Sequence, residues 1–363
     1  MRPERAPKVN GQDPLAGCGP AGAPSPATAP SPATGPEYAI VIPTLGRPSL
    51  SAVLSALDQA GEPCPRRIVL ADDRRPRDHA PLPVDIPEGL RHLVEIVPGR
   101  AAGPAAARNA GWAAAPEPWI VFLDDDVVPG PAWTAWLAGD LAAAGPRTAG
   151  VQGQITVPLP TDRRPTDWER NTAGLATSRW ITADMAYRRA ALEAVGGFDE
   201  RFPRAYREDA DLALRVLAAG WTLAAGVRRT THPVRPAGRW VSVRVQAGNA
   251  DDVLMRRVHG RDWWGRAGAP RGRLPRHVAV TAAGAAVLLC AAARRPRDAA
   301  VCAGLWLAGT AEFAAARIRP GPRTREEITT MVASSAAIPP VATAHWLAGL
   351  ARHRGALAVG ARR

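Results

Sequence analysis

Three consecutive aspartates, Asp124 to Asp126, directly follow a run of bulky apolar residues in the segment WIVFLDDDVVPGPAW, residues 119–133. Alternate residues of an extended chain point the same way, so Asp124 and Asp126 should share one face while Asp125 points elsewhere. Two carboxylates on one face can hold a hard divalent cation such as Mg²⁺ or Mn²⁺, which prefers few carboxylates together with substrate phosphates. A solvated acidic turn before Pro129 is the alternative interpretation.

Two further clusters could bind a ligand. Asp72 and Asp73 end the segment RIVLADD, where a carboxylate could accept a hydrogen bond from a ribose hydroxyl or a base N–H. The alternative is a turn whose charge is balanced by Arg74 and Arg75. In GPAAARNAG, Arg108 offers a guanidinium fork that suits a phosphate, although a single arginine on an alanine-rich helix is usually structural.

The last two clusters could supply a base and a metal ligand. Glu208 and Asp209 open the helical segment REDADLALR. They either complement the helix dipole or provide a general base that removes a proton from a hydroxyl. His232, in RRTTHPV, is either a third metal ligand or a turn histidine.

The elements that must position these residues alternate between strands and helices. Tyr38 to Ile42 predict a strand buried on both faces and ended by Pro43, and the following helix has Ser49 as its expected N-cap. Further strands are predicted at RIVLADD, HLVEIVP and WIVFLDDD, and a helix is predicted to begin at Gly103-Pro104. This alternation predicts an α/β domain with a mainly parallel sheet. Ligands of such sheets bind beyond the carboxyl ends of the strands, so PTLGR, ADDRR and DDDV should converge on one crevice.

The remainder of the chain differs from the first part in its predicted secondary structure and in its arginine content. Residues 150–245 contain a predicted strand, VQGQITV, and the helix from Glu208, whereas the segment after residue 246 is helical and rich in arginine. The predicted division begins with a disordered Pro/Ala-rich leader, 1–36. A nucleotide-sugar-binding half, 37–130, and an acceptor-binding half, 131–245, follow, and a basic helical region with apolar segments, 246–363, ends the chain.

Composition restricts the environment and the partners. The chain has 363 residues and a net charge of +13, and Lys8 is its only lysine. The arginine excess reflects either a compositional bias or an anionic partner. It is not interleaved with aromatic residues, which argues against a basic nucleic-acid-binding protein. Four scattered cysteines without metal-ligand spacing and an N-terminus without an apolar core predict a catalytic part in the cytoplasm.

Taken in order, the motifs resemble those of family 2 glycosyltransferases with the GT-A (Rossmann-like) fold. The matching segments, spread over residues 37–235, are YAIVIPTLGRPSLSAVLSAL, IVLADD, GPAAARNAG, WIVFLDDDVVPGPAW, TADMAYRRAALEAVGGFDERF and REDADLALR. The resemblance implies a metal-dependent, inverting transfer of a sugar from a nucleotide-sugar donor to an acceptor hydroxyl. A cell-envelope glycan or a lipid-linked saccharide is the expected acceptor.

The resemblance also implies residue roles on the donor side. Pro43 and Thr44 match the strand end that lines the nucleotide, and Asp72 matches the aspartate that contacts the base. Arg108 matches the arginine near base or phosphate. Asp124 matches the first residue of the DXD pair, near the ribose and the metal.

On the catalytic side, Asp126 matches the metal ligand of the DXD pair, and Asp209 matches the general base with Glu208 as its neighbour. Asp125 is expected to be a spacer, so that alanine there should be milder than alanine at Asp126. The chain departs from the family at Asp184, where asparagine is commoner, and in TLGR, which replaces TYNR. The segment 238–240, GRW, only faintly resembles QxxRW, and the missing glutamine favours a non-processive enzyme.

Two other interpretations fit the sequence less well. A nucleotidyltransferase of sugar phosphates should carry a glycine-rich basic loop after its first strand, and PTLGRPS has one glycine. A degenerate transferase that only binds its ligand is disfavoured by the intact Asp124, Asp126 and Asp209.

The C-terminal region contains two apolar stretches, 278–293 and 299–316, and a third near 331–350 that is broken by Pro339-Pro340. The first is shorter than the ~20 residues of a membrane-spanning helix, and the second carries Glu312. Packing on the catalytic core is therefore one possibility. Flanking arginines favour the other, attachment to the inner face of the cell membrane by a short hairpin or interfacial helices. They are Arg256, Arg257, Arg261, Arg266, Arg271, Arg273, Arg276, Arg294, Arg295 and Arg297.

Overall fold

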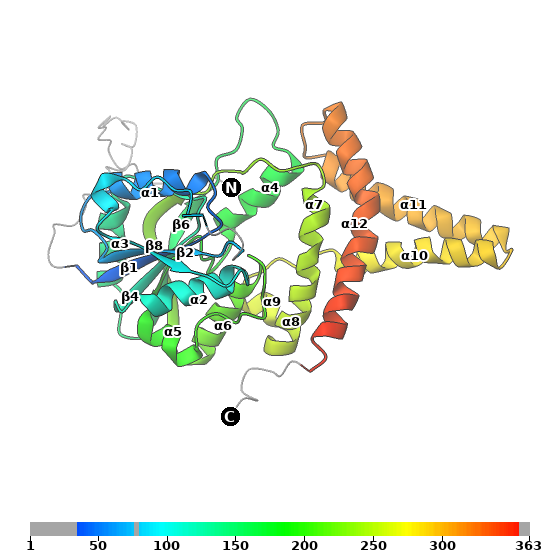
Figure 1. Cartoon of the computed structure of the whole chain (residues 1–363). Helices are drawn as coiled ribbons and strands as arrows, with labels where there is room; N and C mark the ends of the chain where they lie inside the picture. Colours follow the sequence, from blue (N-terminus) through cyan, green and yellow to red (C-terminus); the bar gives the residue numbers. More distant parts are fainter. Residues whose placement is uncertain (1–34, 76–79, 356–363) are drawn as a thin grey trace, which may run out of the picture.

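The computed structural model describes residues 35–75 and 80–355. The predicted leader, residues 1–36, lies almost wholly outside the described residues. Figure 1 shows an α/β domain, drawn from blue to green, beside a group of C-terminal helices in yellow to red.

A single mixed sheet forms the centre of the α/β domain, with the strand order β3-β2-β1-β4-β7-β6-β8-β5. The strands are β1 (Tyr38–Thr44), β2 (Arg67–Asp72), β3 (Val94–Pro98), β4 (Trp119–Leu123), β5 (Val128–Pro129), β6 (Thr148–Thr156), β7 (Asp184–Arg188) and β8 (Thr222–Thr231). The first four strands in this order are parallel, as predicted. The α/β domain expected from the sequence is confirmed, with a partly parallel sheet.

The direction of β8 brings a distant part of the chain to the site. β7 is antiparallel to both β4 and β6, and β6 is parallel to β8. Because the direction reverses twice between β4 and β6, β8 runs the same way as β4. The carboxyl ends of β4 and β8 therefore lie at the same edge of the sheet, which is where Asp124 and His232 follow their strands.

Helices cover both faces of the sheet. The α-helices of the described residues are α1 (Ser49–Gln59), α2 (Pro104–Ala114), α3 (Trp133–Ala142), α4 (Asp167–Ala173), α5 (Arg189–Val195), α6 (Glu208–Ala218), α7 (Val241–Arg244), α8 (Asn249–His259), α9 (Trp263–Arg266), α10 (Leu274–Ala292), α11 (Pro296–Ile318) and α12 (Arg325–Arg352). Ile40 and Ile42 pack in the core beneath α1 and α3, and Ala39 and Val41 pack in the core beneath α2 and α6. The predicted burial of β1 on both faces is confirmed.

Two predicted element boundaries are wrong. β1 continues through Pro43, which pairs with Ala71, and ends at Thr44. A proline lacks only the N–H, so a strand can continue where that N–H is not needed for pairing. Ser49 is the first residue of α1 rather than its N-cap, because Pro48 already has helical backbone angles and occupies the cap position.

The C-terminal helices include a hairpin of α10 and α11 that projects away from the α/β domain (Figure 1). These helices contain 19 and 23 residues and are long and apolar enough to cross a membrane. Only 6% of the apolar stretch of each helix is buried. Most of the hairpin therefore does not pack on the catalytic core. α12 continues through Pro339 and Pro340 as one helix, so the predicted break at this pair is wrong.

Candidate active site

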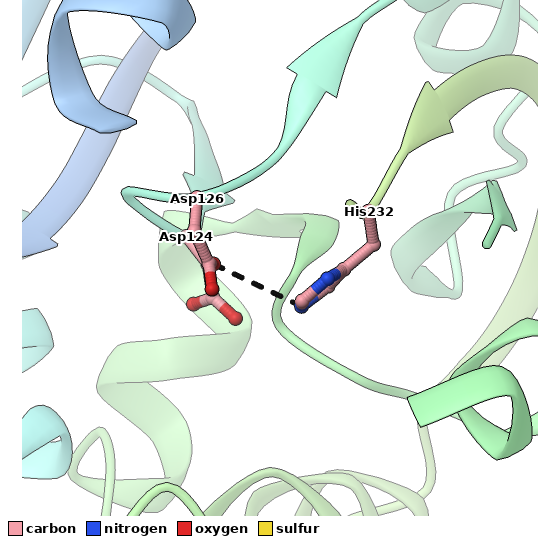
Figure 2. Close-up of side chains that lie close together, drawn as sticks. All are labelled: Asp124, Asp126 and His232. Atoms are coloured by element: carbon pink, nitrogen blue, oxygen red, sulfur yellow. Dashed lines mark ion pairs between the residues drawn. The ribbon is translucent and has the colours of Figure 1, made fainter. Parts of the chain in front are cut away.

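The residues Asp124, Asp126 and His232 form a cluster at the carboxyl edge of the sheet (Figure 2). Their potential ligand atoms all lie within 4.8 Å of one another. Nδ1 of His232 lies 3.2 Å from the carbonyl oxygen of Pro233. In the tautomer with its proton on Nδ1, His232 donates to that carbonyl, and Nε2, which lies 3.8 Å from Oδ1 of Asp126, is its potential metal-ligand atom. Two carboxylates and an imidazole fit Mn²⁺ or Mg²⁺ supplemented by phosphate oxygens.

The charge balance of this cluster also fits a cation. Burial, with a contribution from the neighbouring Asp124, raises the pKa of Asp126, while His232 and Arg235 oppose this shift. Nε of Arg235 lies 2.7 Å from Oδ2 of Asp126, and the Arg235 side chain is 47% exposed. An exposed arginine can move away at small cost, so the Asp126 carboxylate is available to a metal ion.

Asp125 points away from the cluster, as expected, but it is not a bystander. Its side chain is buried, and its carboxylate accepts hydrogen bonds from Thr44 Oγ1 and Arg47 Nη1, both at 2.8 Å. These contacts tie the end of β4 to the turn after β1. The expectation that Asp125 is only a spacer is therefore wrong, because the second residue of the triplet supports one wall of the crevice.

Arg108 lies between two acidic segments, the one that begins at Asp124 and the one that begins at Glu208. It is fully buried on α2, and its Nη2 donates to Asp124 Oδ1 at 2.7 Å while its Nη1 donates to Glu208 Oε1 at 2.8 Å. The predicted phosphate contact is not tested by this geometry. The guanidinium joins the metal cluster to the first turn of α6.

Glu208 and Asp209 open α6, as predicted. Burial and then repulsion from Asp209 raise the pKa of Glu208 to about 8, against the opposing effect of Arg108. Burial also raises the pKa of Asp209, whose Oδ1 accepts from the Ala210 amide at 2.7 Å. A carboxylate with a raised pKa is a stronger base, which suits the removal of a proton from an acceptor hydroxyl.

The two aspartates after β2 have different surroundings. Asp72 forms an ion pair with Arg74, in which Arg74 Nη2 lies 2.7 Å from Asp72 Oδ2, and this lowers the pKa of Asp72. Asp73 accepts hydrogen bonds from the amides of Ala102 and Gly103, at 3.2 and 2.8 Å. Asp73, and not Asp72, lines the cavity beside the metal cluster. The geometry favours the balanced turn for Asp72, and of the two aspartates in this candidate cluster only Asp73 lines the cavity.

This cavity has a volume of about 320 Å³ and lies next to the triplet. Its lining includes Pro43, Thr44, Arg108, Asp124 and Asp126 among the predicted residues. Glu208 and Asp209 do not line it, although Arg108 connects Glu208 to its wall. The structure thus brings five of the predicted positions to one crevice.

Asp184 has a structural role that the sequence did not indicate. It is fully buried and accepts from Trp133 Nε1 at 2.8 Å and from Arg228 Nε at 2.7 Å. Arg228 also donates to Asp140 at 2.9 Å. This buried network links β8 to α3 and, across the intervening β6, to β7, and so fixes the strand that His232 follows.

Arg207, the residue before Glu208, was also missed. It has a left-handed backbone, with φ of +77°, which is unfavourable for a residue with a side chain. Its Nε donates to Asp252 at 2.8 Å, and its guanidinium lies over the rings of Trp263 and Trp264. Helices α8 and α9 thereby hold the turn that presents Asp209. No local sequence pattern signals such a contact.

Comparison with known proteins finds a family model that is similar to part of this chain. The model described as "Glycosyl transferase family 2" matches residues 39–194. The pre-mycofactocin glycosyltransferase of Mycobacterium tuberculosis is 34% identical over 129 residues, which cover 32% of this chain and 27% of the relative. The chain thus spans about a quarter of the length of the curated relatives that it matches.

Solved structures give more distant matches. One is GalNAc-T7 with UDP, GalNAc and Mn²⁺, at 16% identity and a TM-score of 0.44, covering 65% of this chain and 55% of that one. Another is glucosyl-3-phosphoglycerate synthase from Mycobacterium tuberculosis with Mn²⁺, UDP-glucose and phosphoglyceric acid, at 16% identity and a TM-score of 0.40, covering 66% and 82%. These likenesses are too distant to assign the role of any residue in this chain.

Proposed function

We propose that this chain, a member of glycosyltransferase family 2 through its residues 39–194, transfers a sugar from a nucleotide-sugar donor to an acceptor hydroxyl with the help of Mn²⁺ or Mg²⁺. The proposed metal dependence is supported by the Asp124–Asp126–His232 cluster beside the crevice. A bound metal ion would neutralise charge on the diphosphate of the leaving nucleotide.

The roles of the chain's own residues follow from their positions. Asp124 and Asp126 would bind the metal with His232, and Arg108 would hold Asp124 in place through their 2.7 Å contact. Pro43, Thr44 and Asp73 line the cavity and would contact the nucleoside. Asp73 replaces Asp72 in this proposal, because the carboxylate of Asp72 is bound by Arg74.

Asp209 would act as the general base. It lies in the first turn of α6, adjacent to the Glu208–Arg108–Asp124 chain of contacts. With Asp209 as the base of a single displacement, the acceptor oxygen attacks the anomeric carbon from the face opposite the nucleotide. The C–O bond to the diphosphate breaks as the new bond forms, Asp209 takes the proton, and the anomeric configuration inverts.

The acceptor would be a lipid-linked saccharide or a cell-envelope glycan, reached at the cytoplasmic face of the cell membrane. This proposal rests on the exposed hairpin of α10 and α11 and on its flanking arginines. Anionic lipids attract such a basic collar by about 1 kcal/mol per arginine. The division into nucleotide-sugar-binding and acceptor-binding halves at residues 37–130 and 131–245 is part of the same proposal.

A thermal-shift screen tests the donor and metal assignments together. UDP-, GDP-, dTDP- and ADP-sugars are added to the detergent-solubilised full chain with and without Mn²⁺, and Asp126→Asn serves as the control. We expect one nucleotide class to raise the unfolding temperature only with Mn²⁺, and only in the wild type. If none of the four classes raises it, the proposal is wrong.

A further inference from the structure

A groove at the base of the hairpin is separate from the catalytic crevice. It has a volume of about 490 Å³ and lies between α10, α11 and α12. Its walls are apolar, and they are formed by Ala279, Val280, Ala283, Leu305, Gly309, Phe313 and Pro339. Its remaining lining residues, Arg273, Arg276, His277 and Glu312, are polar. The groove therefore combines a narrow apolar channel with a charged mouth.

The hairpin that forms two of these walls is closely packed along its seam. A side chain at Gly309 would come within 2.5 Å of Val280, and one at Gly284 within 3.1 Å of Trp306. Small residues that bring helix backbones together are typical of helix pairs in membranes. Outward-facing apolar side chains such as Leu288 and Leu305 are 73% and 63% exposed. The hairpin is thus a preformed unit whose outer surface matches hydrocarbon.

The ends of the hairpin carry its charge. No charged residue occurs in 278–292 of α10 or in 299–311 of α11. At the base, Arg317 of α11 pairs with Asp167 of α4 at 2.7 Å, which anchors the hairpin to the α/β domain. If the apolar segments enter a bilayer, the groove mouth lies at the leaflet that faces the catalytic domain.

The mouth has an unbalanced positive charge. Glu312 accepts from Arg273 and also lies 3.5 Å from Arg276, so one carboxylate serves two guanidinium groups. The guanidinium of Arg273 is held over the Phe313 ring, 5.1 Å from its centroid. Arg276, whose side chain is 70% exposed, is the less engaged of the two and is free to bind an anion.

We propose that this groove binds one anionic phospholipid of the bilayer, with an acyl chain along Val280, Ala283 and Leu305 and the headgroup phosphate on Arg276. The proposal rests on the membrane attachment included in the proposed function. A phospholipid fits both halves of the site, because its chain needs a dry apolar channel and its phosphate needs a cation at the interface. Arg273 keeps Glu312 neutralised, which removes the repulsion that an anionic headgroup would otherwise meet.

The test measures lipid retention by the full chain. The protein is incorporated into nanodiscs of dioleoylphosphatidylglycerol or dioleoylphosphatidylcholine and then released from them. Native mass spectrometry measures the mass of the lipid that stays bound. We expect one phosphatidylglycerol molecule to remain on the wild type, and phosphatidylcholine to be retained at least about fivefold less. Arg276→Gln should remove this preference, whereas Arg271→Gln should leave it unchanged, because Arg271 carries the same charge but does not line the groove.

A second pair of variants probes the apolar channel. Ala283→Phe fills the groove and should abolish retention of the lipid, while Ala285→Phe, on an exposed position outside the lining, should not. Equal losses from Arg271→Gln and Arg276→Gln would overturn the site in favour of a diffuse basic surface. A lipid-free dimer would overturn it in favour of a second copy. Retention of no lipid by a nanodisc-incorporated protein would overturn the groove alone, whereas failure to enter nanodiscs would overturn the membrane attachment itself.

Discussion

Arg108 and Glu208 are joined by a buried hydrogen bond, with 2.8 Å between Nη1 and Oε1, although they are 100 residues apart in the chain. The second terminal nitrogen of the same guanidinium binds Asp124. The carboxylate expected to contact the metal and the helix turn expected to carry the base are thus held by one side chain. We therefore expect both donor binding and proton removal to depend on this shared support.

Alanine at the second and at the third residue of the triplet should have different effects. Asp126→Ala removes a ligand from the cluster and should abolish Mn²⁺-dependent stabilisation while changing the metal-free unfolding temperature little. Asp125→Ala leaves Thr44 and Arg47 without their acceptor and should cost about 2–3 kcal/mol of folding free energy. Urea unfolding with and without Mn²⁺ separates the two effects. Two identical profiles would contradict the division.

Asp209→Asn should preserve donor binding and slow transfer by at least ~100-fold, because asparagine cannot accept the acceptor's proton. The control is the Mn²⁺-dependent stabilisation by the donor found in the thermal-shift screen, which should be the same in Asp209→Asn as in the wild type. Turnover is measured as release of the nucleoside diphosphate in the presence of acceptor. Turnover close to the wild-type rate would rule out Asp209 as the base.

Glu208 should make the stability of the protein depend on pH. Its pKa is raised from 4.5 to about 8 on folding, so the folded state holds a proton that the unfolded chain has lost. The free energy of unfolding therefore falls as the pH rises from about 5 to about 8. Oε2 of Glu208 has no hydrogen-bond partner among the described residues, and this oxygen can carry the proton while Oε1 still accepts from Arg108.

Glu208→Gln keeps the shape and the neutral charge of the protonated side chain. We expect urea unfolding of this variant to vary less between pH 5.5 and pH 8.5 than that of the wild type. The same slope in both proteins would show that Glu208 does not titrate in this range.

Arg228→Met should destabilise the fold strongly. It leaves the buried Asp140 and Asp184 without the cation that contacts both, a loss of about 3–5 kcal/mol in the free energy of unfolding. Arg229→Met is the matched control, because its side chain is exposed on the same strand, and it should change stability by less than about 0.5 kcal/mol. A loss below about 1 kcal/mol for Arg228→Met would contradict the structural role of the network.

Much of the fold and part of the site could be predicted from local pattern. Continuous apolar runs such as Tyr38 to Ile42 indicate strands buried on both faces, and polar residues at the ends of parallel strands must meet at one edge. That reasoning correctly brought Thr44, Asp124 and Asp126 together. It also found the start of α6 at Glu208, because helix dipoles favour acidic residues in the first turn.

Other features depended on contacts between distant residues. The choice between Asp72 and Asp73 was decided by where the chain turns after β2, and the partners of Arg108 by which carboxylates reach it across the sheet edge. The projection of the apolar hairpin was decided by the packing of α10 and α11 on each other. The sequence by itself determined which elements form and which residue types end them, since these follow from short-range periodicity. Only the tertiary structure decided the pairing of buried charges, because a charge removed from water is neutralised by whichever partner the whole fold brings within reach.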